Sequence, residues 1–498
     1  MFNFSLNIKT EAGRELIAPF SMSLNQNDRV ALIGEEGNGK SLTLKALVQD
    51  NSLDELHVSR TLNSRHVVFG YLSQEMPRTL LEQDALSYII KEQWNRYGDV
   101  SRKMKEVLPH FEMEDLNRPM HSYSGGERVR LQLLQLMVHP CDCYLLDEPS
   151  NDLDLETLMW LEGWMLAQTK PIIFVSHDVM FLQTCANRIV HLEQTHRKTR
   201  SHVTVYEGDY QGYCDAFLSQ IQKHNHDVKL RQKEKQKQEA RWHQLYQKVE
   251  HRQRTQTRQD PAKGRLLKKK MHTIKSMERR FEREVVPEKR DFEGAIKLSF
   301  EEQAKIHQKK ILDFHLDELV REGRILACDL DLVVYSRDRI AIVGSNGVGK
   351  TTLLHEIIKE IDAEDVGVMH QSYDLNLDYD LSPIENCVLE GSRDERGLIT
   401  NHLGSLKFTE DEMNTPMERL SGGQKAKVSL LKLVLKNPKI IILDEPTRNL
   451  SPLSVGVIYH LLNNYQGAII SVTHDRALIQ EVMDDVYSFD ASGLKKIS

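Results

Sequence analysis

Gly34-Glu-Glu-Gly-Asn-Gly-Lys-Ser41 follows the apolar run Arg29-Val-Ala-Leu-Ile33, and Gly344-Ser-Asn-Gly-Val-Gly-Lys-Thr351 follows Arg339-Ile-Ala-Ile-Val343. A glycine-rich loop between a buried strand and a helix can wrap phosphate groups with its backbone N–H groups. The positive end of the following helix faces the same phosphates. The sequence therefore predicts two phosphate-binding loops, each on its own strand–loop–helix unit.

Four further motifs follow each loop in the same order. In the first half they are Gln74, Tyr123-Ser-Gly-Gly-Glu127, Leu146-Asp-Glu-Pro149 and His177, and in the second Gln371, Leu420-Ser-Gly-Gly-Gln424, Leu443-Asp-Glu-Pro446 and His474. Each member of the second set stands 297 positions after its counterpart. This constant spacing indicates an internal duplication of a whole domain.

The apolar runs predict the fold class. Residues 143–146 and 172–175 are nearly continuous apolar stretches, and 439–443 and 468–472 repeat them. Such strands are typical of a parallel sheet covered by helices on both faces. We therefore expect an α/β protein with two P-loop domains, each carrying a helical insert, at roughly 75–122 and 372–419.

A segment of different composition joins the two halves. From 211 to 256 it is rich in Lys, Gln, Glu and Arg, and Pro261 and Gly264 interrupt it. Because proline and glycine break helices, the sequence predicts an antiparallel helical hairpin that turns at 258–264. Its apolar stripes are expected to face each other: Trp242, Leu245 and Val249 against Leu267, Met271, Ile274 and Phe281. The predicted domains are residues 1–217, a linker at 218–290, and residues 291–498.

Charge is distributed unevenly along the chain. The formal net charge is −7, yet residues 221–290 contain 22 Lys and Arg against 9 Asp and Glu. A basic connector on an acidic protein favours a polyanionic partner, although a solvated charged helix is the plain alternative. The candidate RNA-binding residues are Arg252, Arg254, Arg258, Lys263, Arg265, Lys268, Lys269 and Lys270.

Composition also bears on the class of protein. No apolar run approaches the roughly 18–20 residues that cross a bilayer, and the N-terminus lacks a basic-then-apolar signal. The six cysteines show no metal-type spacing, and scattered thiols suit a reducing compartment. We expect a cytoplasmic protein with no membrane partner.

The duplicated motifs supply the parts needed to hydrolyse ATP with Mg²⁺. Each loop lysine is expected to reach the β- and γ-phosphates, and the hydroxyl after it to reach Mg²⁺. A glutamate directly after the metal-side aspartate is placed to act as general base. The predicted catalytic residues are Glu148 and Glu445, with His177 and His474 as γ-phosphate sensors. The predicted Mg²⁺ ligands are Ser41, Gln74, Asp147, Thr351, Gln371 and Asp444.

The Ser-Gly-Gly-Glu and Ser-Gly-Gly-Gln motifs resemble the signature sequence of ATP-binding cassette proteins. The resemblance implies that the signature of each cassette closes over the nucleotide of the other. Lys40, Asp147 and Glu148 would then pair with Ser421, Gly422 and Gly423, and the Lys350 site with the 124–126 signature. The implied ATP contacts are Gly34, Gly37, Gly39, Lys40, Ser41, Gln74, Ser124, Gly125, Gly126, Asp147, Gly344, Asn346, Gly347, Gly349, Lys350, Thr351, Thr352, Gln371, Ser421, Gly422, Gly423 and Asp444.

Without transmembrane helices, the chain is similar to the ABC-F branch, whose members act on ribosomes. Gly70-Tyr-Leu-Ser-Gln74, Tyr206-Glu-Gly-Asp-Tyr210 and the basic connector carry this closer resemblance. It implies a monomer with intramolecular cassette pairing that binds rRNA and tRNA near the exit site and the peptidyl-transferase centre. Closure on ATP would drive the hairpin toward that centre, and hydrolysis would release the protein.

Two departures from the family pattern fall on the same composite site. Glu35 and Glu36 place carboxylates in the first phosphate loop, where they should weaken nucleotide binding. Ser451 stands where the family has an aspartate, in the loop implied to face Lys40. We expect asymmetric sites, with the Lys350 site turning over faster.

Several functions are compatible with these motifs. Within the ribosome-binding hypothesis, the chain confers antibiotic resistance by ribosome protection or relieves stalled translation without a resistance role. The short insert in the first cassette and the Thr447–Pro452 sequence resemble resistance-type members. A DNA-associated cassette ATPase usually carries a basic C-terminal coiled coil, which this sequence lacks. The ATPase subunit of a transporter would have no use for a long basic hairpin.

Overall fold

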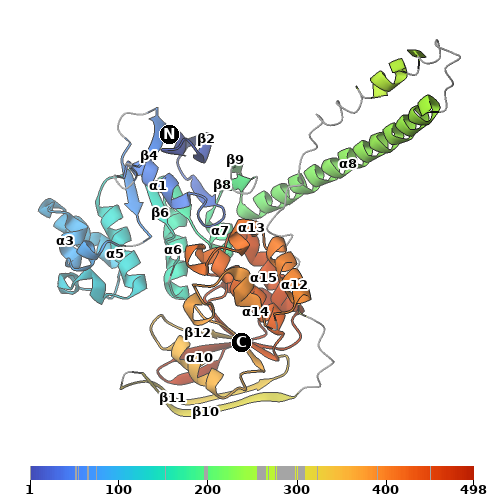
Figure 1. The fold of residues 1–498 in the computed structure, drawn as a ribbon. Helices are drawn as coiled ribbons and strands as arrows, with labels where there is room; N and C mark the ends of the chain where they lie inside the picture. Colours follow the sequence, from blue (N-terminus) through green and yellow to red (C-terminus); the bar gives the residue numbers. More distant parts are fainter. Residues whose placement is uncertain are drawn as a thin grey trace. The chain divides into compact units, whose positions relative to one another are not determined.

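The computed structural model describes residues 2–50, 53, 55–63, 67–74, 76–151, 153–195, 200–254, 265–266, 268–274, 276, 298, 300, 309–321, 323–389, 391–448 and 450–497. The chain separates into two compact units. One contains both nucleotide-binding halves, residues 1–213 and 293–498, and the other is the connector, residues 214–292 (Figure 1). The two halves are called the first and second cassette below.

The first cassette is built on a six-stranded sheet of mostly parallel strands (Figure 1). Its strand order is β5 (Phe69–Leu72), β6 (Cys143–Asp147), β7 (Ile172–Val175), β3 (Arg29–Ile33), β8 (Arg188–Thr195) and β9 (Arg200–Glu207), with only β9 antiparallel. The apolar runs β6 and β7 are buried along their whole length, as the sequence predicts. A second sheet contains β2 (Glu15–Leu24), β1 (Phe2–Thr10) and β4 (Leu56–Leu62), all antiparallel.

The second cassette repeats this topology. Its sheet has the order β13 (Val366–Met369), β14 (Ile440–Asp444), β15 (Ala468–Val472), β12 (Arg339–Val343), β16 (Asp485–Asp490) and β17 (Gly493–Lys496). A long antiparallel pair, β10 (Lys310–Arg321) and β11 (Arg324–Tyr335), accompanies it. Because both sheets place the phosphate-loop strand beside the strand that precedes the histidine, the duplication inferred from the sequence is confirmed in three dimensions.

Helices connect the strands of each cassette. In the first cassette they are α1 (Lys40–Val48), α2 (Arg78–Leu81), α3 (Ala85–Ile90), η2 (Trp94–Arg96), α4 (Tyr97–Val107), η3 (Met113–Asn117), η4 (Met120–Ser122), α5 (Gly125–Val138), α6 (Leu155–Ala167) and α7 (Val179–Cys185). In the second they are α10 (Lys350–Lys359), η6 (Tyr373–Leu375), α11 (Pro383–Cys387), α12 (Arg393–Ser405), α13 (Glu410–Met413), η7 (Met417–Arg419), α14 (Gly422–Lys436), α15 (Pro452–Asn464) and α16 (Arg476–Val482). The helices from α2 to η4 and from η6 to η7 form the predicted inserts.

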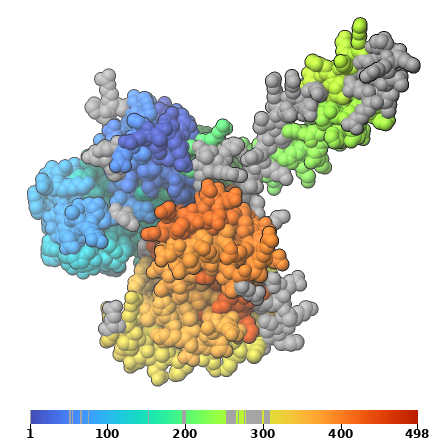
Figure 2. All heavy atoms as spheres, in the orientation of Figure 1, coloured from blue at the N-terminus to red at the C-terminus, as the bar shows by residue number. Residues whose placement is uncertain are grey.

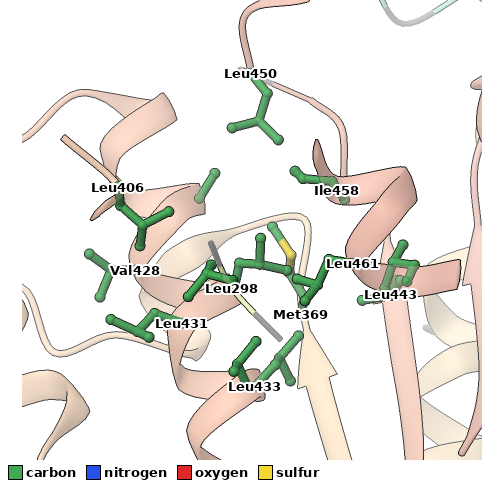
Figure 3. Packing of buried hydrophobic residues seen from close by; sticks show 14 of the residues in the cluster. Leu298, Met369, Leu406, Val428, Leu431, Leu433, Leu443, Leu450, Ile458 and Leu461 are labelled. Carbon is green, nitrogen blue, oxygen red and sulfur yellow. The ribbon is translucent and has the colours of Figure 1, made fainter. Parts of the chain in front are cut away.

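Apolar clusters fill the space between sheets and helices. In the second cassette, Leu298 lies among Leu406, Val428 and Leu431, with Leu461 of α15 nearby (Figure 3). This cluster also receives Val179 and Met180 of α7 from the first cassette. The two cassettes therefore share part of a core, and their spheres meet directly in Figure 2.

The connector begins with one long helix, α8 (Tyr210–Arg254), and residues 265–266, 268–274 and 276 are also helical. Trp242 Nε1 donates a hydrogen bond to the carbonyl oxygen of Ile274 at 2.9 Å, and Ile274 is buried. This contact joins the two arms of the predicted hairpin. The expected stripe is wrong at Leu245, which is 49% exposed, because Trp242 packs instead beside Tyr246 one turn along the helix. Leu267 and Phe281 lie outside the described residues.

The described part of the chain contains no helix long and apolar enough to cross a membrane.

Candidate active site

Backbone conformation shapes the first phosphate loop. Gly34, Gly37 and Gly39 all have positive φ, and a Cβ at Gly34 would lie 2.4 Å from the carbonyl oxygen of Leu192. Only glycine fits such a position without strain. The buried Lys40 at the start of α1 donates to the carbonyl oxygens of Gly34 at 2.9 Å and Glu35 at 3.1 Å. The loop is therefore closed around its own lysine.

The second loop repeats this arrangement. Lys350 Nζ lies 2.6 Å from the carbonyl oxygen of Gly344 and 3.0 Å from that of Ser345. A third neighbour is His474, whose Nε2 is 3.0 Å from Lys350 Nζ. Burial and the Lys350 charge lower the pKa of His474 to about 4, so the imidazole is neutral. Its Nε2 therefore accepts a hydrogen bond from the Lys350 ammonium group.

A hydroxyl and a carboxylate meet beside each loop. Ser41 Oγ donates to Asp147 Oδ1 at 3.0 Å, and Thr351 Oγ1 donates to Asp444 Oδ2 at 2.8 Å. Burial raises the pKa of both aspartates. Oxygen donors of this kind suit Mg²⁺, which completes its shell with water and substrate phosphates. The described residues contain no cluster of three His, Cys, Asp or Glu side chains that could hold a metal by itself.

Glu148 is held by three neighbours at the end of β6. His177 Nε2 lies 3.1 Å from Glu148 Oε1, Gln74 Nε2 donates to Oε2 at 3.3 Å, and Asn151 Nδ2 also donates to Oε2. Burial would raise the pKa of Glu148, but the hydrogen bond from His177, the nearby Lys40 charge and the Asn151 amide lower it overall. The carboxylate is therefore ionised and fixed in direction.

Glu445 occupies the equivalent turn in a different environment. Both glutamates adopt positive φ, 50° at Glu148 and 52° at Glu445, and their N–H groups donate to Val175 and Val472. His474 Nε2 is 3.9 Å from Glu445 Oε1, because the ring is turned to Lys350. Burial and the Asp444 charge raise the pKa of Glu445 to about 7. Gln371 is exposed, and the described contacts include no hydrogen bond from it to Glu445.

Both signature motifs begin a helix. Ser124 caps α5 and Ser421 caps α14, each by accepting a hydrogen bond from the N–H group three residues later. Glu127 and Gln424 complete a capping box by accepting the serine N–H in return. The glycine N–H groups of the first turn remain directed out of the helix, where an anion can bind.

The structure brings the first loop and the second signature together. Gly423 N–H donates to Glu36 Oε2, and one pocket is lined by Glu35, Glu36, Ser421, Gly423 and Ser451, with Leu406, Lys407, Phe408, Gln424, Lys427 and Leu450. His177 Nδ1 is 2.6 Å from the carbonyl oxygen of Leu450, so the histidine joins Glu148 to the other cassette.

The loop that follows Glu148 extends toward the other site, the one around Lys350. Asp154 caps α6 through the N–H of Thr157 at 2.9 Å, and its charge raises the pKa of both Lys350 and His474 against the stronger effect of burial. Ser451 holds the matching position before α15, where its hydroxyl pairs with Ser454 at 2.8 Å. No described contact links Ser124, Gly125 or Gly126 directly to the second phosphate loop.

Two features of this region are absent from the sequence-based predictions. Tyr71 donates to Asp147 Oδ2 at 3.3 Å. Arg476 of α16 forms an ion pair with Glu162 of α6 across the cassettes, with Nη1 3.2 Å from Oε2. A comparison at the 297-residue spacing could have drawn attention to this pair, because it matches Arg476 with Val179 and Glu162 with Tyr459.

The candidate RNA-binding residues lie on the connector. Arg265, Lys268, Lys269 and Lys270 are exposed, and Arg252 and Arg254 belong to the last turn of α8. Arg258 and Lys263 lie outside the described residues.

Comparisons with known proteins agree with the duplicated site. The ABC transporter family pattern matches residues 17–151 and again 328–448. The chain is 29% identical to ATP-binding protein Uup of Escherichia coli (strain K12), over 95% of this chain and 77% of that protein. It is 26% identical to ABC transporter F family member 5 of Arabidopsis thaliana, over 96% of this chain and 73% of that protein.

A solved structure shares the fold. The archaeal ribosome recycling factor aABCE1, determined in complex with the ribosomal stalk protein aP1, gives a TM-score of 0.58 at 16% identity, covering 95% of this chain and 86% of that chain.

Proposed function

The chain belongs to the ABC transporter family, in its ABC-F group of paired cassettes, and we propose that it hydrolyses ATP to ADP and phosphate and binds the ribosome in its ATP-bound state. We assign its domains as two cassettes, 1–217 and 291–498, and a basic hairpin linker, 218–290. The observation that carries the proposal is the contact of His177 with Glu148 on one side and Leu450 on the other. It connects a candidate catalytic carboxylate with closure of the cassettes.

In this mechanism the phosphate loops bind ATP through their N–H groups and their lysines. Mg²⁺, held by Ser41 and Asp147 or by Thr351 and Asp444, would neutralise charge on the β- and γ-phosphates. Glu148 and Glu445 each orient a water molecule and accept its proton as the water oxygen attacks the γ-phosphorus. The bond from the γ-phosphorus to the bridging oxygen breaks in the same step, so that ADP leaves. His177 holds Glu148 in place and senses whether Leu450 is in contact.

ATP binding would then be coupled to the connector. Signature N–H groups that point at the γ-phosphate hold the cassettes closed, and hydrolysis removes this attraction. Exposed lysines at 268–270 provide charge for rRNA and tRNA phosphates, which gives a salt-sensitive attraction largely independent of base sequence. We place the closed form at the tRNA exit site, with the hairpin directed to the peptidyl-transferase centre. Ribosome binding would make the chain a cytoplasmic protein.

Ribosome sedimentation tests the proposal. The Glu148→Gln/Glu445→Gln variant lacks both candidate bases, so ATP should trap it on ribosomes, while the wild type with ATP cycles off. Pelleting of the variant with ATP, with ADP and without nucleotide measures this difference. The proposal is wrong if the variant stays in the supernatant with ATP at moderate salt.

The physiological use of ribosome binding is a separate part of the proposal. We infer antibiotic resistance by ribosome protection, with relief of stalled ribosomes as the alternative. Expression in a susceptible host should raise the minimum inhibitory concentration of lincosamides, pleuromutilins or streptogramin A. The double glutamate variant is the control. Unchanged susceptibility to all three classes would favour the stalled-ribosome role.

A further inference from the structure

The two phosphate loops differ at the residue that faces the opposite cassette. Position 36 is glutamate, and the corresponding residue of the second loop is Asn346. Glu36 Oε2 accepts a hydrogen bond from the Gly423 N–H of the second cassette at 2.5 Å. Asn346 Oδ1 instead lies 3.5 Å from Lys350 Nζ of its own loop. Only the first loop therefore places a carboxylate on the signature helix of the other cassette.

The described contacts give the Gly423 N–H, at the start of α14, no partner within its own helix. Ser421 Oγ accepts from the N–H of Gln424, and the Lys425 N–H bonds to the Ser421 carbonyl oxygen. The first-turn donors left for an outside partner are those of Gly422 and Gly423. An anion at this end is favoured by both the hydrogen bond and the helix dipole. Glu36 satisfies these requirements without any nucleotide.

We propose that Glu36 is an internal competitor of ATP at the Lys40 site. This inference rests on the nucleotide-binding part of the proposed function. A γ-phosphate between Lys40 and the second signature needs the same N–H group, and its charge repels the carboxylate. Glu36 must therefore leave Gly423 before this site closes on ATP. The Lys350 site has no such competitor and fills first.

Glu36 and its neighbour Glu35 differ in their contact with the second cassette's signature helix. Both carboxylates line the same pocket, together with Lys407 and Lys427. Either glutamate adds negative charge near a bound phosphate, but only Glu36 bonds to Gly423. Each is replaced by the residue that the second loop carries, Glu36→Asn and Glu35→Ser. The two substitutions change the charge equally, and only Glu36→Asn removes the bond to Gly423.

Nucleotide affinity at the Lys40 site is the first test. The full-length protein carries Lys350→Ala, so that binding of a fluorescent, non-hydrolysable ATP analogue with Mg²⁺ reports on the other site. Glu36→Asn should tighten binding roughly tenfold more than Glu35→Ser, since it removes a charged hydrogen bond as well as a charge. Equal tightening by the two substitutions would overturn the proposal.

Thermal stability without nucleotide is the second test. Glu36→Asn should lower the melting temperature of the nucleotide-free protein, because the cassettes lose the bond to Gly423. If Glu36 did not compete with ATP, its replacement would not both tighten ATP binding and lower the melting temperature of the nucleotide-free protein. A melting temperature that Glu36→Asn does not lower would also overturn the proposal. Wild-type protein that binds no nucleotide would contradict the proposed function itself.

Discussion

Glu148 and Glu445 show how identical motifs acquire different chemistry. Both follow an aspartate at the end of a buried strand and both adopt positive φ. The hydrogen bond from His177 lowers the pKa of Glu148, whereas burial raises the pKa of Glu445 to about 7. The difference arises because His177 turns to the glutamate and His474 turns to Lys350.

The rates of ATP hydrolysis at the two sites should follow this difference in the pKa of the two glutamates. A general base with a pKa close to ambient pH accepts a proton more readily than a carboxylate whose pKa is lowered. The Lys350 site, isolated in Glu148→Gln, should therefore hydrolyse ATP about tenfold faster in a single turnover than the Lys40 site in Glu445→Gln. Rapid-quench assays with excess enzyme measure both rates, with the double variant as background. Equal rates would refute the asymmetry.

A second residue-scale prediction concerns Asp178, which caps α7. Burial and the charges of Asp475 and Glu162 raise its pKa to about 6, against the hydrogen bond from the Phe181 N–H and the charge of Arg476. The folded protein therefore holds this proton more tightly than the unfolded chain. Its contribution to stability falls as pH rises from about 4 to above 6.

Asp178→Asn keeps the cap but removes the titration. Relative to wild type, this variant should gain about 1 kcal/mol of unfolding free energy between pH 5 and pH 7.5. Urea unfolding at the two pH values measures the change. The variant Asp84→Asn, at the carboxylate that caps α3, controls for the substitution itself. A difference from wild type that is the same at both pH values would show that Asp178 does not titrate in this window.

Residue types and their spacing predict the candidate catalytic residues, because each motif is typical of a local task such as holding a phosphate or a proton. The sequence does not predict the contact of Tyr71 with Asp147, because the hydroxyl reaches the aspartate from the neighbouring strand. The register of these two strands cannot be read from sequence alone. The direction of His474 was equally inaccessible, because Ser-His-Asp and Thr-His-Asp motifs look alike and only packing decides which partner the ring meets.

At the scale of elements, α6 and α16 form a contact between the cassettes that is not repeated on the opposite side. Arg476 and Glu162 are 17% and 10% exposed in their side chains. The matching positions at the 297-residue spacing are Val179, which packs into the second cassette, and Tyr459, whose hydroxyl donates to Asp475 at 2.7 Å. One side is thus ionic and the other largely apolar.

Removing one partner of the Arg476–Glu162 ion pair should lower the unfolding free energy strongly, whereas replacing both partners should lower it only a little. Arg476→Val leaves the Glu162 carboxylate buried without its partner and should lower the unfolding free energy by about 3 kcal/mol. The Glu162→Tyr/Arg476→Val variant copies the opposite side and should recover most of that loss. A double-mutant cycle in urea measures the coupling. If the single losses simply add, the ion pair does not join the cassettes energetically.

The connector shows what helix-level patterns can predict. Its composition and the break at Pro261 and Gly264 predicted two arms, and the Trp242–Ile274 hydrogen bond joins them. The pattern gave the wrong face at Leu245, because residues 245 and 246 both lie one turn from Trp242 and the aromatic contact with Tyr246 prevailed.

At the scale of the whole molecule, the duplication and the basic connector were predictable because both are properties of composition and order. The pairing of one cassette's loop with the other's signature entered only through the family resemblance. Its side-chain detail, Glu36 on Gly423 and His177 on Leu450, depends on contacts between residues more than 270 positions apart, which no local pattern encodes.

The charge division between connector and cassettes yields the last prediction. If exposed connector lysines neutralise RNA phosphates, replacing Lys268, Lys269 and Lys270 by alanine should weaken ribosome binding and reduce the dependence of log K on log salt by roughly 2. Pelleting of the double glutamate variant with ATP across a KCl series measures the slope.

A matched control places alanine at Lys310, Lys439 and Lys496, each of which is paired with an aspartate on the second cassette. This triple substitution removes the same charge elsewhere and should leave the slope unchanged. Equal effects of the two triple substitutions would mean that net charge, and not the connector, governs the attraction.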